Sequence, residues 1–341
     1  MFSWLQFFIY LIVPAALAVP LGSYVKRVMC GERVFLSPIL APCESLIYSL
    51  SGIDRDERMP WRRYALSLFA FSALSFLLLF LLLLCQGFLP GNTPGLSGFD
   101  PALAFNAAAS YVTNTDWQAF NSDFAVGNFV KTVGFGVQNF LSPAAGIAVF
   151  FAPVRGFTSS GEGGLGSFWC DLVRAVLYIL IPLNLIAALL LAGGGVIQNF
   201  DAASRLPLLE PFAVNADGTL IPDAEIDTES KSVTSGGALL PDAVIVTEQY
   251  VPLGPAASLV AAKQIGTNGG GFTTVNSAHP FENPNVFTNF IEMLSIVLIP
   301  MSLCFAFGKA INNAKQGAAL FAAMFICLAA AAGVTAFCEG R

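Results

Sequence analysis

Two short polar motifs hold the residue types best suited to chemistry in this sequence. The first is Thr113-Asn114-Thr115, and the second is Thr267-Asn268, which continues into Gly269, Gly270 and Gly271. Threonine hydroxyls, asparagine amides and backbone carbonyls all offer oxygen ligands, the kind that hard cations take. Glycine permits the positive φ values that turn successive carbonyls toward one axis, and rings of such carbonyls can replace the hydration shell of potassium. The motifs therefore predict a path for an alkali cation, most readily potassium.

A short apolar segment opened by proline precedes each motif, over residues 101–112 and 255–266. Proline suits the first helical position, which makes Asp100 and Gly254 possible N-caps. A helix of 12 residues is too short to cross a bilayer, which takes about 20, so each segment suits a re-entrant helix. The carbonyls at the end of such a helix carry partial negative charge and would favour a cation.

The two segments are copies of one unit at a fixed offset. Pro101 and Thr113 are 12 residues apart, as are Pro255 and Thr267, so the copies are in register at an offset of 154. Ordinary surface turns would explain a lone run of glycines, but two copies in register favour pore loops. Repeats in membrane transporters put the substrate path where they meet.

Lipid must cover most of this chain, because only 11% of its 341 residues are charged, against about 25% in soluble domains. Six apolar runs are long enough to span a bilayer. They are Phe7–Val25, Tyr64–Phe88, Asn128–Val154, Cys170–Ile197, Phe287–Phe307 and Ala318–Cys338. The predicted fold class is an all-α polytopic membrane protein, in which a unit of span, short helix, polar turn and span occurs twice. Nothing resembles a basic surface for nucleic acid.

The loop charges predict the orientation in the membrane. The loop between the first two spans carries Lys26, Arg27, Arg33, Arg55, Arg58, Arg62 and Arg63. Residues 89–127 contain no lysine or arginine, and residues 198–283 contain ten acidic side chains against three basic ones. Positive-inside bias then puts the N-terminus and the even-numbered loops outside.

We therefore divide the sequence into four parts. Residues 1–63 hold the first span and a basic cytoplasmic loop. Residues 64–154 form a first pore repeat, with its short helix at 101–112 and its filter at 113–116. Residues 170–308 form a second repeat, with an acidic outer insertion at 198–254, a short helix at 255–266 and a filter at 267–271. Residues 318–341 hold the sixth span and begin an incomplete third repeat.

Two other classes of protein are alternatives, an intramembrane enzyme and a plain membrane anchor. An intramembrane enzyme would need paired ionisable groups, and the candidates are Lys131, Glu292 and the single histidine, His279, which lies in an Asn/Pro-rich loop. A plain membrane anchor would not need two polar turns in register. Asp171 and Arg174 lie three residues apart on one helical face, which predicts a local ion pair.

Several stretches resemble the potassium-binding subunit of the Kdp potassium-transporting P-type ATPase, a member of the potassium-transporter superfamily. They are Val112–Gln118, Val137–Ser142, Gly146–Val149, Gly266–Phe272, Asn276–Pro284 and Cys304–Gly308. The motifs follow the family order and spacing from the first span to the sixth. A Trk/Ktr-like channel subunit that works without an ATPase partner is the alternative, and the first and fourth stretches, Val112–Gln118 and Gly266–Phe272, fit it less well.

The resemblance implies a subunit that selects potassium from the extracytoplasmic side and does not itself hydrolyse ATP. It implies as partners a P-type ATPase subunit and small accessory membrane subunits (KdpB-, KdpC- and KdpF-like), a multi-pass location in the bacterial inner membrane, and no organic cofactor. The family's filter positions carry over onto Thr113, Asn114, Thr115, Thr267, Asn268 and Gly269. Their neighbours Asp116, Gly270 and Gly271 complete the candidate potassium-binding residues. Gln118 matches a position that influences potassium affinity in the family.

Three features depart from the family pattern. Asp116 stands where the family usually has asparagine, which would put a carboxylate near the outer mouth. The stretch 215–248 is longer than usual and acidic, which indicates a solvated insertion. Only two of the family's four pore loops are present, so we expect this chain to be a truncated or split piece of a longer one.

Overall fold

The computed structural model describes residues 4–90, 96–158, 164–201, 203–227, 230–274 and 276–339. The chain forms two compact units. The first combines Met1–Gln198 with Pro255–Arg341, and the second is Asn199–Gly254. The two polar motifs and every apolar run belong to the first unit.

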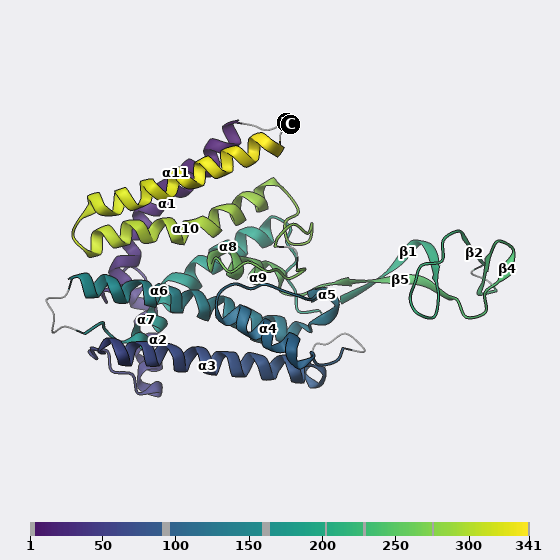
Figure 1. The fold of residues 1–341 in the computed structure, drawn as a ribbon, viewed down its shortest axis with the longest axis horizontal. Helices are drawn as coiled ribbons and strands as arrows, with labels where there is room; N and C mark the ends of the chain where they lie inside the picture. Colours follow the sequence, from purple (N-terminus) through teal and green to yellow (C-terminus); the bar gives the residue numbers. More distant parts are fainter. Residues whose placement is uncertain are drawn as a thin grey trace. The chain divides into compact units, whose positions relative to one another are not determined.

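Within the described residues, six helical segments are long and apolar enough to cross a membrane. Three are single helices, which are α1 (Trp4–Met29), α10 (Val286–Ala310) and α11 (Ala314–Glu339). The other three are composite (Figure 1): α3 (Trp61–Cys85) with η1 (Gln86–Phe88), η2 (Val130–Gly136) with α6 (Val137–Thr158), and α7 (Phe168–Arg174) with η3 (Ala175–Leu180) and α8 (Ile181–Gly193). The expected helical, polytopic membrane fold is confirmed. Residues 340–341, at the end of the part 318–341, lie outside the described residues.

In the described part of the chain, four shorter helices lie between the spans: α2 (Ser37–Ser51), α4 (Pro101–Val112), α5 (Ser122–Ala125) and α9 (Ala256–Ile265). Helix α4 packs against α3 and α6, and α9 packs against α8 and α10. Each short helix thus lies between the spans that flank it in sequence, so the two copies share one arrangement.

The N-termini of the two short helices differ. Asp100 caps α4 by accepting a hydrogen bond from the Ala102 backbone nitrogen at 2.9 Å, as expected. In α9 the N-cap is Pro255 rather than Gly254, and no side chain caps it. The predicted N-cap, Gly254, was wrong by one residue, because the helix begins after Pro255 and not at it.

Helix α10 lies at the centre of three packed spans, since it contacts both α1 and α11 (Figure 1). A side chain at Gly22 of α1 would meet the Ser302 carbonyl of α10 at 2.5 Å. Gly308 of α10 and Gly317 of α11 also face each other, since a Cβ atom at Gly308 would lie 2.8 Å from the Gly317 Cα atom. Small residues let helix backbones approach closely in membranes, where packing replaces the hydrophobic effect.

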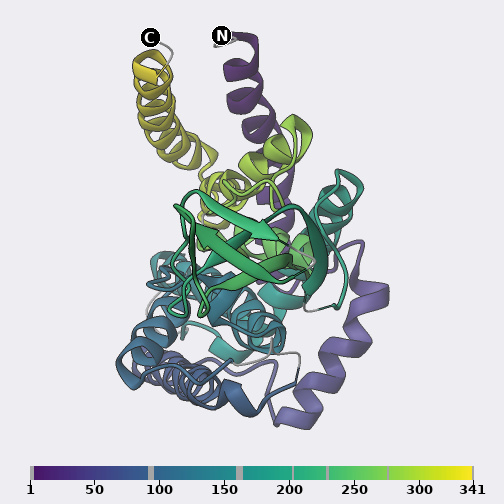
Figure 2. The same ribbon diagram turned by 90° about the vertical axis from the view of Figure 1, so that its right-hand side faces the viewer.

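The second unit consists of strands, which sequence analysis did not anticipate. Strands β1 (Ala203–Val214) and β5 (Val244–Pro252) pair antiparallel, with a register shift between Pro207 and Phe212. Strands β2 (Ala224–Asp227), β3 (Ser232–Ser235) and β4 (Ala238–Leu239) form a small antiparallel sheet (Figure 2). The run of β-branched residues at the start of β5 is the feature of the sequence that could have predicted a strand.

The expected ion pair between Asp171 and Arg174 does not form. Asp171 is 1% exposed and binds Arg155 of α6, with N–O distances of 2.5 and 2.7 Å. Arg174 instead donates from Nε to Glu44 of α2 at 3.1 Å. Buried partners on other helices replace the neighbour on the same helix, because a buried carboxylate needs a matched, desolvated cation.

Candidate functional site: two polar turns that meet

Asparagines at equivalent positions of the two repeats bind each other. Asn268 donates from Nδ2 to Oδ1 of Asn114 at 2.5 Å, and Asn114 donates from Nδ2 to the Gly266 carbonyl at 3.2 Å. Ser142 of α6 completes the cluster by donating to the same Asn114 oxygen at 2.8 Å. Its hydroxyl also accepts from Asn268 at 3.1 Å. The predicted filter motifs are therefore joined by their side chains.

Gln118 joins the two turns a second time, through the backbone. Its Nε2 donates to the Gly271 carbonyl at 3.2 Å, and its Oε1 accepts from the Gly271 nitrogen at 3.0 Å. The amide therefore pairs with both backbone groups of one residue, as a neighbouring strand would. Nε2 also donates to Ser122 at 2.8 Å. Gln118 thus sets the register of the second turn against the first.

The backbone of both turns is left-handed at several positions. Positive φ values occur at Asn114 (63°), Asp116 (51°), Thr267 (57°), Gly269 (95°) and Gly270 (64°). Such conformations cost about 1–3 kcal/mol each for residues other than glycine, and they cluster at functional sites. A Cβ atom at Gly270 would lie 2.7 Å from the Asp116 carbonyl oxygen, so glycine is required there for space as well.

The threonines of the first motif lie at the carbonyl end of α4. The Thr113 hydroxyl donates to the Ala109 carbonyl at 2.8 Å and lies 3.3 Å from the Thr115 hydroxyl. Both threonines are exposed, whereas Asn268 of the other motif is buried. Hydroxyl oxygens are therefore accessible beside the amide cluster.

Asp116 is buried, with 1% of its surface exposed. With its amide turned so that the nitrogen faces the carboxylate, Asn139 donates to Oδ2 at 2.6 Å. Oδ1 has no hydrogen-bond partner among the described residues. Burial raises the pKa of Asp116 to about 8, although the nearby Lys263 ammonium acts in the other direction.

A buried ion pair, missed by sequence analysis, supports the second turn. Lys263 of α9 and Glu282 are 2% and 0% exposed, and their N–O distance is 2.5 Å. Lys263 also donates to the Gly270 carbonyl at 3.2 Å, while Glu282 accepts from the Thr273 nitrogen and hydroxyl at 2.5 and 2.7 Å. Lys263 is the only charged residue in its apolar segment, and this feature of the sequence could have predicted a buried acidic partner, because a buried lysine needs one.

Comparison with known proteins assigns the family. The family model described as potassium-transporting ATPase A subunit matches residues 8–341. The chain belongs to this A-subunit family. The resemblance noted in the sequence is thereby confirmed.

Curated relatives named "Potassium-transporting ATPase potassium-binding subunit" are similar along nearly the whole chain. One from Clostridium botulinum (strain Alaska E43 / Type E3) is 47% identical over 330 residues, which are 97% of this chain and 52% of the relative. One from Desulfovibrio desulfuricans is 46% identical over 334 residues, or 98% and 53%. The chain thus spans about half the length of the relatives it matches.

The ionisable groups considered for an intramembrane enzyme have structural partners in this A-subunit chain. The Lys131 ammonium lies 4.1 Å from the centre of the Phe272 ring, and His279 Nδ1 accepts from the Phe281 nitrogen at 3.1 Å. Glu292 accepts from Gln264 at 2.9 Å. No group of three or more His, Cys, Asp or Glu side chains in the described ranges could hold a metal ion.

Proposed function

We propose that this chain is the potassium-binding and translocating subunit of an ATP-driven potassium uptake complex. The observation that carries the proposal is the contact between Asn114 and Asn268, which joins two turns of one repeated unit at 2.5 Å. Repeat interfaces are where membrane transporters place their substrate path. Membership of the potassium-transporting ATPase A-subunit family supports the same function.

Potassium is the transported substrate in this proposal, and oxygen atoms of the two turns bind it. Thr113, Asn114, Thr115 and Asp116 serve in the first turn, and Thr267, Asn268, Gly269, Gly270 and Gly271 in the second. The proposal rests on non-helical backbone that follows α4 and α9, each of which packs against its flanking spans. Membranes tolerate such backbone only inside protein or along a water-filled path. Carbonyl ends of α4 and α9 add partial negative charge beside the turns. Gln118 is a positioning residue, because its amide holds Gly271.

The proposal extends to the partners and the location of this chain. A P-type ATPase subunit hydrolyses ATP, small accessory membrane subunits complete the complex, and this chain itself is not hydrolytic. The relatives' shared name, which speaks of one subunit of an ATPase, supports this division of labour. The protein lies in the bacterial inner membrane with its N-terminus outside, because the basic residues gather in the loop before the second span.

Potassium uptake in a transport-deficient bacterium, with the full-length subunit and its ATPase partner expressed together, tests the function. Gly269→Asp adds a side chain and a charge where φ is 95°, and it should abolish discrimination between potassium and rubidium or raise the KM for potassium at least tenfold. Gly218→Asp is the matched control, because φ is 84° there and a Cβ atom meets nothing within 4 Å. Unchanged uptake kinetics in Gly269→Asp would refute the proposed path.

A further inference from the structure

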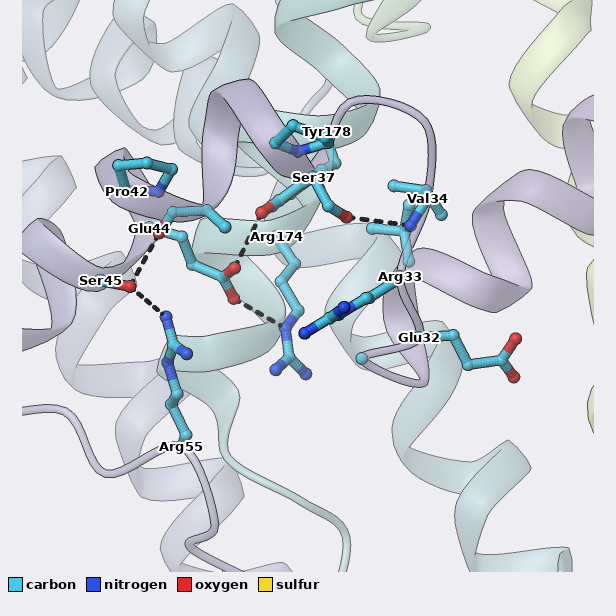
Figure 3. A pocket seen from close by; sticks show the side chains of 14 residues that line it. Glu32, Arg33, Val34, Ser37, Pro42, Glu44, Ser45, Arg55, Arg174 and Tyr178 are labelled. Carbon is cyan, nitrogen blue, oxygen red and sulfur yellow. Dashed lines mark hydrogen bonds and ion pairs between the residues drawn. The ribbon is translucent and has the colours of Figure 1, made fainter.

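A large polar cavity lies away from the two turns, between the end of α1, helix α2 and the start of the fourth span. Its volume is about 700 Å³. Figure 3 shows the guanidinium groups of Arg33, Arg55 and Arg174 around it, together with Glu44. A cavity of this size is ample for a phosphate-bearing headgroup, since ligand sites run from about 300 to 1,000 Å³.

The charge of the cavity is positive, because its acidic residues already have partners. Glu44 accepts from Tyr178 at 2.9 Å and from Arg174 at 3.1 Å (Figure 3). It also accepts from Tyr48 at 2.8 Å, so both carboxylate oxygens are engaged. These bonds outweigh burial, which alone would raise the pKa of Glu44, and hold that pKa below its ordinary value. The carboxylate therefore stays charged and fixes Arg174.

Two further arginines are not neutralised by an acid. Arg33 and Arg55 form no ion pair in the part of the chain that the structure describes, and the Ser45 hydroxyl that accepts from Arg55 at 2.7 Å carries no charge. Glu32, the other acid on the cavity wall, pairs with Lys26 and Arg27. Arginine is suited to phosphate, because its planar fork binds two oxygens at once.

Helix α2 indicates that the cavity opens at a membrane surface. Its polar residues Glu44 and Tyr48 are buried against the protein, whereas Ile39, Leu46 and Leu50 are 70%, 60% and 79% exposed. Fifteen residues are too few to span a bilayer. A short helix with apolar residues on its outer face suits the boundary between headgroups and acyl chains.

An apolar groove of about 590 Å³ adjoins the polar cavity and runs along α1, α8 and α10. Tyr178 lines both, and the cavity residues Val34 and Ser37 flank the groove residues Phe35 and Leu36 in sequence. The groove extends along the fourth span to Leu190. Twelve helical residues rise about 18 Å, and one leaflet of the hydrocarbon core is about 15 Å thick. The groove is therefore long enough for one acyl chain.

We propose that the cavity and the groove together bind an anionic phospholipid. The phosphate lies among Arg33, Arg55 and Arg174, and one acyl chain lies between Tyr178 and Leu190. The positive cavity selects the charge of the headgroup, and the groove restricts the site to a lipid. The inference does not depend on the potassium path, since it shares no residue with the two turns.

Native mass spectrometry of the purified complex, mixed with phosphatidylglycerol or phosphatidylcholine, tests the headgroup site. The wild type should retain phosphatidylglycerol preferentially. Arg33→Gln and Arg55→Gln should each weaken its retention about fivefold, in line with about 1 kcal/mol for each basic residue near an anionic lipid. The matched controls Arg58→Gln and Arg62→Gln remove exposed charges of the same loop outside the cavity and should change little. Equal retention of the two lipids would overturn the proposal.

A second pair of variants separates a lipid from a free anion. Ile186→Trp fills the groove, whereas Leu189→Trp lies on the same helix outside it, and both positions are more than half exposed. Only Ile186→Trp should reduce phosphatidylglycerol retention. If millimolar inorganic phosphate displaces phosphatidylglycerol and Ile186→Trp has no effect, the site binds soluble phosphate and the lipid proposal fails.

Discussion

Asn268 donates a hydrogen bond to Asn114 at 2.5 Å, and the two residues are 154 positions apart, which is also the offset of the sequence repeat. Equivalent side chains of the two repeats therefore contact each other at the repeat interface. Both also bind Ser142 of α6, which ties the pair to a span. A contact between equivalent residues links the repeat seen in the sequence directly to the geometry of the candidate path.

The asparagine pair should be energetically coupled. Asn114→Ala and Asn268→Ala should each lower the apparent melting temperature of the purified complex and its affinity for potassium. A hydrogen bond is worth about 1 kcal/mol, so the double variant should lose less than the sum of the two single losses by about that amount. A double-mutant cycle on potassium affinity measures this. Strict additivity would show that the contact is not made in the membrane.

Gly270→Ala should impair folding or potassium uptake, because the new Cβ atom would lie 2.7 Å from the Asp116 carbonyl oxygen at a φ of 64°. Gly237→Ala is the control for the strain of a positive φ without a clash, since φ is 79° there and a Cβ atom would meet nothing within 4 Å. Complex yield, melting temperature and uptake should all be lower for Gly270→Ala. Equal effects at the two glycines would mean that only φ matters.

Breaking the buried pair between Lys263 and Glu282 should be costly. Glu282→Gln leaves the lysine charge uncompensated, which costs roughly 3–5 kcal/mol. Adding Lys263→Met to Glu282→Gln should recover part of that stability, because no charge remains buried. Thermal unfolding of the complex measures both. Arg63→Gln is the control, because Arg63 is exposed in its pair with Glu57 at 2.7 Å, and the change should cost no more than about 1 kcal/mol.

Asp116 should make stability depend on pH. Its folded-state pKa of about 8 lies above the ordinary value of 3.8, so the folded protein keeps a proton that the unfolded chain releases between these pH values. Stability therefore falls as pH rises through that window. Asp116→Asn should raise the melting temperature increasingly from pH 5 to pH 8, and the exposed Asp242→Asn should not. An equal shift at every pH would exclude titration of Asp116.

Cysteine labelling from outside the cell tests the orientation. In a background without native cysteines, a maleimide that cannot cross membranes should modify Asp217→Cys in the second unit. It should leave Arg55→Cys unmodified until the cells are opened. Both positions are exposed, so accessibility in the protein itself is matched. The reverse pattern would contradict a path that opens outward through the two turns.

Sequence alone determined the class of the fold and the position of the repeated unit. Apolar length and scarce charge indicate spans directly, since a bilayer sets both. The short helix predicted over residues 101–112 is α4, Pro101–Val112, because proline and Asp100 mark its start locally. The polar turn after each short helix was equally visible, since glycine, threonine and asparagine interrupt an apolar pattern.

Tertiary structure decided which side chains meet. Asp171 binds Arg155 rather than Arg174, and Lys263 finds Glu282, because a buried charge pairs with whichever opposite charge the packing brings near. The strands of the second unit and the burial of Asp116 also depend on long-range contacts that no local pattern encodes. The sequence shows two similar turns, and only the packing of α4 and α9 between their spans brings Asn114 to Asn268.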